Sequence, residues 1–302
     1  MRPLTSPPVI VVSILAMAFV GNTYAETLDR EVAADPHGAV EISNVSGKIE
    51  VSGWNRPNVH VQADYGGGVE RVEVTTESGR TVIRVVLQHS SWWGGGSGGS
   101  ADLKVQLPKD SKLDVSGVSS GVSSTGIDGP QHLRTVSGGI TADIGGTDVD
   151  VKTVSGEIRL RGVGQQGSIH LSAISGDISL EHAAGDLEAS TVSGSVDVHV
   201  NPARSVRLHT TSGSVSFEGT LLRGASLDAQ SLSGRLRVQA PAQAGYQYEA
   251  SSFSGSIRDC FNAEPERTGH YGPGSSLNGT LGEGGAQVRL KTLSGSIELC
   301  NH

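Results

Sequence analysis

Apolar and polar residues alternate with a period of two along most of the chain, which is the pattern of strands that bury one face. The alternation is organised around a recurring Val-Ser-Gly or a close variant, spaced by about nineteen residues. An internal repeat of this kind indicates a stacked, quasi-one-dimensional architecture rather than a globule. The copies contain Ser46, Ser119 (a degraded copy), Ser137, Ser155, Ser175, Ser193, Ser212, Ser233, Ser254 and Ser294.

Each repeat predicts two short strands. The third and fifth residues after the serine are apolar, and so are the sixth and fourth residues before it, while the second residue before it is small. Glycine-rich corners separate the two strands, and glycine suits a corner where φ turns positive. One repeat cannot bury its own apolar face, so copies must stack. We therefore expect an all-β fold, a single-stranded parallel β-helix (β-solenoid) with coils of about nineteen residues.

The regularity of the repeat divides the chain. Residues 26–37 are expected to be a short N-terminal lead, and residues 38–302 a single β-solenoid domain. Within that domain, residues 38–113 form an irregular, hairpin-rich part that caps the open edge, because uncovered strand edges invite aggregation. Regular coils follow over 114–260, then an inserted loop over 261–287 and the last coil over 288–302.

If the repeats stack in register, outward residues at the same repeat position become neighbours, and their charges should be complementary. The fifth residue before each serine is charged or histidine, and neighbours of opposite sign stabilise adjacent strands. In chain order, neighbouring residues of this column have opposite charges or include a neutral histidine, except that Asp228 falls beside Glu249. Its members are His132, Asp150, His170, Glu188, Arg207, Asp228, Glu249 and Arg289.

The two cysteines occupy one repeat position. Cys260 is the sixth residue after Ser254, and Cys300 is the sixth after Ser294. Equivalent residues of consecutive coils lie near the separation that a disulfide requires. We predict a Cys260–Cys300 bridge that closes the inserted loop and staples the last coil.

The first 25 residues read as a targeting segment. A positive start at Arg2 is followed by an apolar run over 9–20 and by small or polar residues that favour signal cleavage after Ala25. That run is too short to cross a bilayer, and no transmembrane segment is expected after it. Without Arg2, 22 basic and 31 acidic residues remain, a net charge of −9. This charge argues against nucleic acid or anionic lipid as the main partner. We expect an exported protein of the bacterial periplasm or cell surface.

Three features together resemble a known family. They are the opening Val45-Ser46-Gly47-Lys48-Ile49-Glu50-Val51-Ser52-Gly53-Trp54, the segment Leu103-Lys104-Val105-Gln106-Leu107-Pro108, and the serial Ser-Gly repeats. The chain resembles the bacterial putative-adhesin family of β-strand-repeat envelope proteins, a domain-of-unknown-function group. The resemblance implies a single-stranded β-helix in the cell envelope and no defined catalytic residues.

Candidate chemistry is sparse. Glu157 and Asp177 hold the same outward position in adjacent coils, at a separation that would suit a retaining glycosidase. Asp143, Asp148 and Asp150 surround a glycine corner, but calcium requires six to eight oxygen ligands. Solvated surface charge explains both groups better. We expect no catalytic site, no metal and no cofactor.

Two interruptions of the repeat are the expected binding loops, because binding residues concentrate in loops on rigid scaffolds. One carries Trp92 and Trp93, and the other carries Phe261, His270 and Tyr271. Either loop could instead cap the stack. The leading hypothesis is a non-catalytic envelope protein, an adhesin or interaction scaffold, whose partner is an unknown envelope protein or surface glycan. The alternative is a polysaccharide-binding or polysaccharide-cleaving β-helix.

Overall fold

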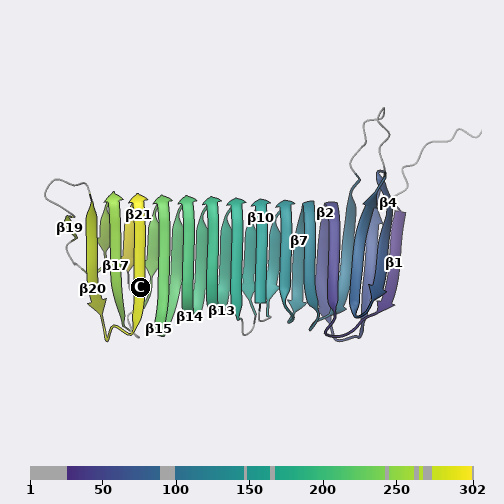
Figure 1. Ribbon diagram of the computed structural model, residues 1–302, viewed down its shortest axis with the longest axis horizontal. Helices are drawn as coiled ribbons and strands as arrows, with labels where there is room; N and C mark the ends of the chain where they lie inside the picture. Colours follow the sequence, from purple (N-terminus) through teal and green to yellow (C-terminus); the bar gives the residue numbers. More distant parts are fainter. Residues whose placement is uncertain are drawn as a thin grey trace, which may run out of the picture.

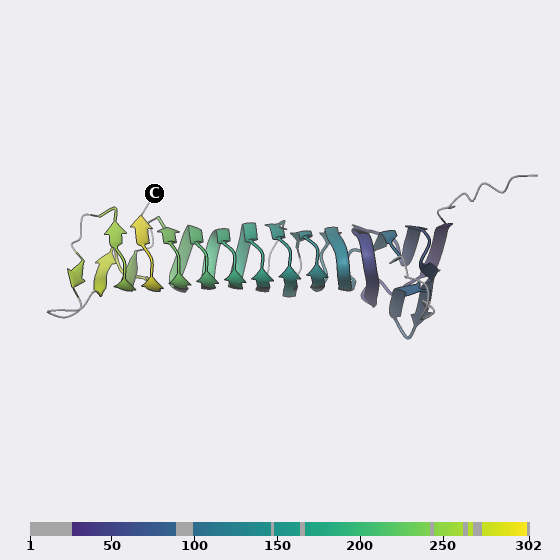
Figure 2. The same ribbon diagram turned by 90° about the horizontal axis from the view of Figure 1, so that it is seen from above.

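The computed structural model describes residues 26–88, 99–145, 148–163, 167–241, 245–261, 265–267 and 274–300. These residues form strands and turns that stack along one long axis (Figures 1 and 2). No helix occurs in these ranges, so none there could span a membrane. The expected signal segment 1–25 and its cleavage point lie outside the described residues.

The strands pair into two rows, one before and one after the repeat serines. The pre-serine row runs β4-β5-β2-β7-β8-β10-β12-β13-β14-β15-β21-β17-β20-β19. The post-serine row runs β1-β3-β6-β2-β7-β9-β11-β13-β14-β15-β16-β22-β18. The bounds are β1 Glu26–Ala33, β2 Ala39–Trp54, β3 Asn58–Tyr65, β4 Val69–Glu77, β5 Arg80–Leu87, β6 Ala101–Pro108, β7 Lys112–Ile127, β8 Gln131–Ser137, β9 Ile140–Ile144, β10 Asp148–Ser155, β11 Ile158–Gly162, β12 Ser168–Ser175, β13 Ile178–Ser193, β14 Val196–Ser212, β15 Val215–Ser233, β16 Leu236–Gln239, β17 Tyr246–Ser254, β18 Ile257–Asp259, β19 Glu266–Arg267, β20 Ser275–Leu281, β21 Ala286–Ser294 and β22 Ile297–Cys300.

Repeats stack in parallel with serine on serine. Ser155, for example, registers with Ser137 on one side and Ser175 on the other. The apolar positions identified from the sequence point inward from both rows and form one narrow core, in which Leu171 and Ile178 are fully buried. The predicted all-β stack of repeats is thereby confirmed. Several strands, such as β13, β14 and β15, also continue past the corner opposite the serines, where separate short strands were expected.

The glycine that follows each repeat serine is required for a different reason from the one expected. Most of these glycines do not have a positive φ. A Cβ atom added at Gly176 would lie 1.9 Å from the carbonyl oxygen of Gly156 in the preceding coil. The same close approach recurs at Gly138, Gly156, Gly234, Gly255 and Gly295. Glycine is therefore fixed at this corner by the contact between coils.

The N-terminal end is closed by antiparallel strands. β1, which covers most of the expected lead, pairs with β3, and β3 pairs with β6. β4 and β5 form a hairpin whose second strand pairs in parallel with β2. The described strands of this end contain one hairpin, β4–β5, rather than the several expected, and residues 26–33 of the expected lead form an edge strand.

The last coil, β21 and β22, corrects the expected order of the stack. β21 lies between β15 and β17, and β22 lies between β16 and β18 (Figure 1). The chain therefore skips one position after β16, forms the outermost coil from β17 and β18, and returns to fill the gap. The apolar positions are the same in every coil, so the apolar repeat pattern alone does not determine which copy occupies which rung.

The expected inserted loop over 261–287 contains two strands. β20 pairs antiparallel with β17 and covers the open edge of the pre-serine row, and the two-residue β19 pairs with β20. The insertion is thus a cap, and it carries the chain back toward the gap that the last coil fills.

Candidate interaction surface

The structure exposes a row of large apolar side chains along the serine corner. The residue immediately before each repeat serine points outward, and nine of these residues are 37–61% exposed. Only Thr211, on β14, interrupts the row with a polar side chain. We call this row the corner ridge; in stack order it comprises Val45, Val118, Val136, Val154, Ile174, Val192, Thr211, Leu232, Leu293 and Phe253.

The corner ridge is not among the features predicted from the sequence. The signal was nevertheless present. Buried residues stand two, four and six positions before the serine, so the residue one position before it is out of phase with the core. An apolar residue recurring at an outward position is the pattern that would have revealed the ridge.

The ridge is large for an exposed apolar surface. Ten rungs at the usual strand spacing of about 4.8 Å extend over about 43 Å. With its members about half exposed, the ridge presents on the order of 700 Å² of mostly apolar surface, whereas monomeric proteins rarely expose a continuous patch above a few hundred Å². Patches of that size typically mark contacts with another molecule.

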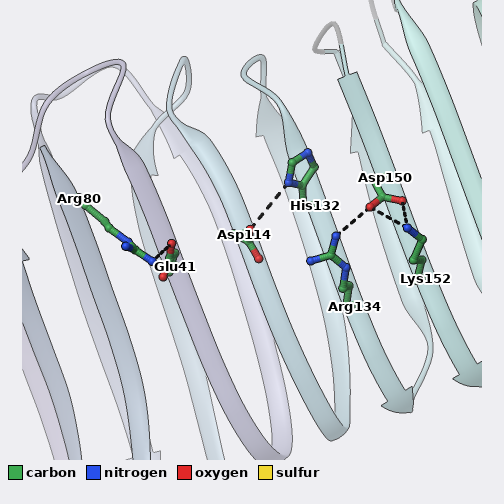
Figure 3. A network of polar contacts seen from close by, with 7 residues as sticks. All are labelled: Glu41, Arg80, Asp114, His132, Arg134, Asp150 and Lys152. Carbon is green, nitrogen blue, oxygen red and sulfur yellow. Dashed lines mark hydrogen bonds and ion pairs between the residues drawn. The ribbon is translucent and has the colours of Figure 1, made fainter.

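A ladder of charges runs along the pre-serine row, at the position four residues before the ridge residue of each strand. Figure 3 shows part of this ladder. Glu41 pairs with Arg80, and Asp114 lies 3.7 Å from His132. Burial would raise the pKa of the Asp150 carboxyl, but hydrogen bonds from Lys152 and Arg134 hold that pKa below its ordinary value. These contacts fix the register of the coils that carry the ridge.

The like-charged pair Asp228 and Glu249, adjacent in chain order, is not adjacent in the structure. Because the last coil is interposed, Arg289 separates Asp228 from Glu249, and its Nε atom lies 3.3 Å from the Glu249 carboxylate. On the post-serine row, Glu298 likewise separates Arg237 from Arg258. Like charges that would meet in chain order are thus kept apart by opposite ones.

The predicted cysteine pair forms a disulfide. Cys260 and Cys300 lie in adjacent coils with Cα atoms 5.0 Å apart. The bridge joins the end of the outermost coil to the end of the interposed last coil. It closes the insertion and staples the last coil, as predicted, although that coil lies one rung inside the outermost one.

Of the five residues predicted to form binding loops, only Phe261 lies within the described residues. Trp92, Trp93, His270 and Tyr271 lie outside the described residues. Phe261 is half-buried against the core, and its ring centroid lies 6.3 Å from that of Tyr248. Phe261 is thus a packing residue of the C-terminal cap rather than an exposed docking group.

The two candidate carboxylates, Glu157 and Asp177, lie in adjacent coils as expected, and each has a partner. Glu157 forms an ion pair with Arg159 at 2.5 Å, and Asp177 accepts a hydrogen bond from the backbone amide of Ser195 at 2.7 Å. Asp143 accepts hydrogen bonds from the Nε and Nη2 atoms of the Arg161 guanidinium. Among the described residues no cluster of three or more potential metal ligands occurs.

A polar cluster stabilises the N-terminal cap. His60 stacks against Trp54, and its Nε2 atom lies 2.7 Å from Asp29 on the edge strand β1. The hydrogen bond to Asp29 raises the pKa of His60, although burial opposes it. Hydrogen bonds from His60 and Gln62 lower the pKa of Asp29. This cluster attaches β1 to the stack.

Comparisons with known proteins identify the family of the chain. A family model described as Toastrack DUF4097 matches residues 37–300. Similar solved structures include a putative adhesin from Bacteroides fragilis, with 11% identity and a TM-score of 0.44 over 91% of this chain and 97% of that one. Others are a putative cell adhesion protein from Clostridium sporogenes (11%, TM-score 0.28, 92% and 99%) and a putative adhesin from Parabacteroides merdae (10%, 0.29, 91% and 96%). No curated protein matches the chain.

Proposed function

Because the chain belongs to the Toastrack DUF4097 family, a group of unknown function, we propose its role from its surface: a non-catalytic envelope protein of adhesin type that binds a partner through the corner ridge. The observation that carries the proposal is the exposed aliphatic row along the serine corner. A rigid stack presents these side chains in fixed positions, so little conformational entropy is lost when a partner covers them.

Export to the periplasm or cell surface is part of the proposal. A signal segment over 1–25 supports it, and so does the Cys260–Cys300 disulfide, because disulfides persist in oxidising compartments. We further infer that the coils follow the path of a single-stranded parallel β-helix. The in-register parallel pairing of successive repeats supports that path.

Binding to isolated bacterial envelope fractions tests the function. A ridge variant carries Val154→Ser, Ile174→Ser and Val192→Ser, which remove apolar surface from three adjacent rungs without touching the core. The expected result is at least a tenfold loss of the fraction that sediments with envelopes, because the centre of an interface supplies most of its affinity.

A matched control carries serine-to-alanine changes at the next residue of the same coils, at positions 155, 175 and 193. This control is expected to bind as the unmodified protein does. Equal sedimentation of the ridge variant and the unmodified protein, with melting curves showing both to be folded, would contradict the proposal.

A further inference from the structure

Two grooves of opposite character lie side by side at the C-terminal end of the pre-serine row. Both are lined by β15, β21, β17 and β20, on the outward face of the stack. The first is polar, with a volume of about 810 Å³, and the second is mainly apolar, with a volume of about 560 Å³. Each volume lies within the range of small-molecule sites, roughly 300–1,000 Å³.

The polar groove follows the charged column of the last coils. Asp228 accepts a hydrogen bond from Gln230, and Glu249 pairs with Arg289, so both acids are engaged. Arg207 lines the same groove and makes no ion pair within the described part of the chain. Amide and hydroxyl groups complete the lining, from Gln247, Asn278, Thr280 and Gln287.

The apolar groove contains the C-terminal end of the corner ridge. Leu232, Leu293 and Phe253 line it, and Phe253 is 61% exposed. Its described lining includes no acidic residue, and the ammonium group of Lys291 forms no ion pair among the described residues. Lys291 stands on β21 between Arg289 of the polar groove and Leu293 of the apolar one, at the boundary of the two.

We propose that the paired grooves bind one single-chain anionic amphiphile as a free molecule, with its aliphatic chain in the apolar groove and its hydroxyl-bearing head group in the polar groove. Lys291, which forms no ion pair among the described residues, selects a negative charge near the boundary. Arg207 lies in register between Glu188 and Asp228, so its charge is already balanced by neighbouring rungs. The aliphatic chain gains affinity by covering ridge side chains, by up to roughly fourfold for each fully buried methylene. The proposal rests on the proposed function to the extent that three ridge residues line this site.

Titration calorimetry of the purified, disulfide-bonded protein tests the site. The probe is 1-lauroyl-lysophosphatidylglycerol below its critical micelle concentration. We expect saturable binding with one amphiphile per chain. Glycerophosphoglycerol, which lacks the chain, and lauroyl-lysophosphatidylcholine, which lacks the net charge, are each expected to bind at least tenfold more weakly.

Two surface variants separate the contributions. Leu293→Ser is expected to weaken binding of the anionic amphiphile at least tenfold, because it removes the middle of the aliphatic wall. Lys291→Gln is expected to reduce the preference for phosphatidylglycerol over phosphatidylcholine head groups to less than threefold. Both side chains are exposed, and a melting curve for each variant verifies that it is folded.

The Val154→Ser, Ile174→Ser pair is the matched control, because it removes ridge side chains outside the grooves. It is expected to bind the amphiphile as the unmodified protein does. If the mid-ridge change weakens envelope binding while no amphiphile binds, the proposed function stands and this site is wrong. Unchanged binding in Leu293→Ser would also overturn it. So would binding only to vesicles of diacyl phosphatidylglycerol, which would indicate a membrane surface instead.

Discussion

The interposed last coil makes Glu249→Arg a test in which two orders of stacking predict opposite signs. In the structure Glu249 shares a rung with Arg289, at 3.3 Å between Nε and the carboxylate. In a stack that followed chain order, Glu249 would face Asp228 instead. The substitution therefore replaces attraction by repulsion in the observed order, and repulsion by attraction in the chain order.

The expected size follows from the exposure of the pair, because both side chains are about half exposed. Exposed charge pairs on neighbouring strands contribute about 0.2–1 kcal/mol, and like pairs cost a similar amount. Glu249→Arg should thus destabilise the outer coils by about 0.5–1.5 kcal/mol. Adding Arg289→Glu restores this pair but places a glutamate beside Asp228, so we expect a partial rescue, measurable as the coupling energy of a double-mutant cycle.

Native-state hydrogen exchange is the suitable assay, because stacked repeats open locally rather than as one unit. The observed order predicts that amides of β17 and β21 exchange about two- to tenfold faster in Glu249→Arg, and that 0.5 M salt reduces the difference by screening. Slower exchange of these amides than in the unmodified protein would refute the interposed position of the last coil.

The remaining predictions concern the cap, the staple and the corner. The raised pKa of His60 means that its contribution to stability is complete below its unfolded pKa of roughly 6.5 and is lost as the pH rises through the folded value. The lowered pKa of Asp29 contributes above roughly pH 3.9 and is lost as the pH falls through its folded value. His60→Gln should accordingly remove the difference in the protection factors of the β1 amides between pH 5.5 and pH 8.5, after the intrinsic pH dependence of exchange is divided out, and a difference that persists in the variant would place its cause elsewhere. Alkylation without reductant should leave Cys260 and Cys300 unmodified by mass, whereas two added groups would contradict the bridge. Gly176→Ala should destabilise the stack by about 2 kcal/mol or more, because its Cβ would enter the neighbouring carbonyl; a melting temperature equal to that of the unmodified protein would show that the coils are not in such contact.

The repeat, its register and the cysteine pairing could be predicted from the sequence because each depends on local periodicity. Period-two alternation places the third residue after each serine inward, as Ile158 and Ile178 illustrate. Equal offsets from the serine place Cys260 and Cys300 at the same position of neighbouring coils. The repeat and its register follow from strand geometry alone. The cysteine pairing also requires the two coils to be adjacent, and they are adjacent both in chain order and in the observed order.

The order of the last coils could not be predicted in that way, because in-register repeats are interchangeable. The charges contained the missing information. Asp228 and Glu249 conflict in chain order, as do Arg237 and Arg258, and interposing the last coil relieves both conflicts at once. A repeat in which like charges collide at two positions therefore predicts that another strand lies between the copies.

The edge strand β1 escaped prediction for a different reason. Half of its residues are charged, and only Leu28 and Val32 pack against the core. An edge strand needs little apolar surface, because its backbone hydrogen bonds to β3 hold it, and charged side chains protect its free edge. Periodicity of apolar residues does not detect such a strand.

Site-specific photocrosslinking in cells tests most directly whether the corner ridge is the contact surface. A photoreactive residue at Ile174 reports on the ridge, and one at Ser216 reports on the outward face of the post-serine row. Our account predicts a discrete crosslinked product from Ile174 and none from Ser216. Crosslinking from Ser216 alone, or equal crosslinking from both positions, would contradict it.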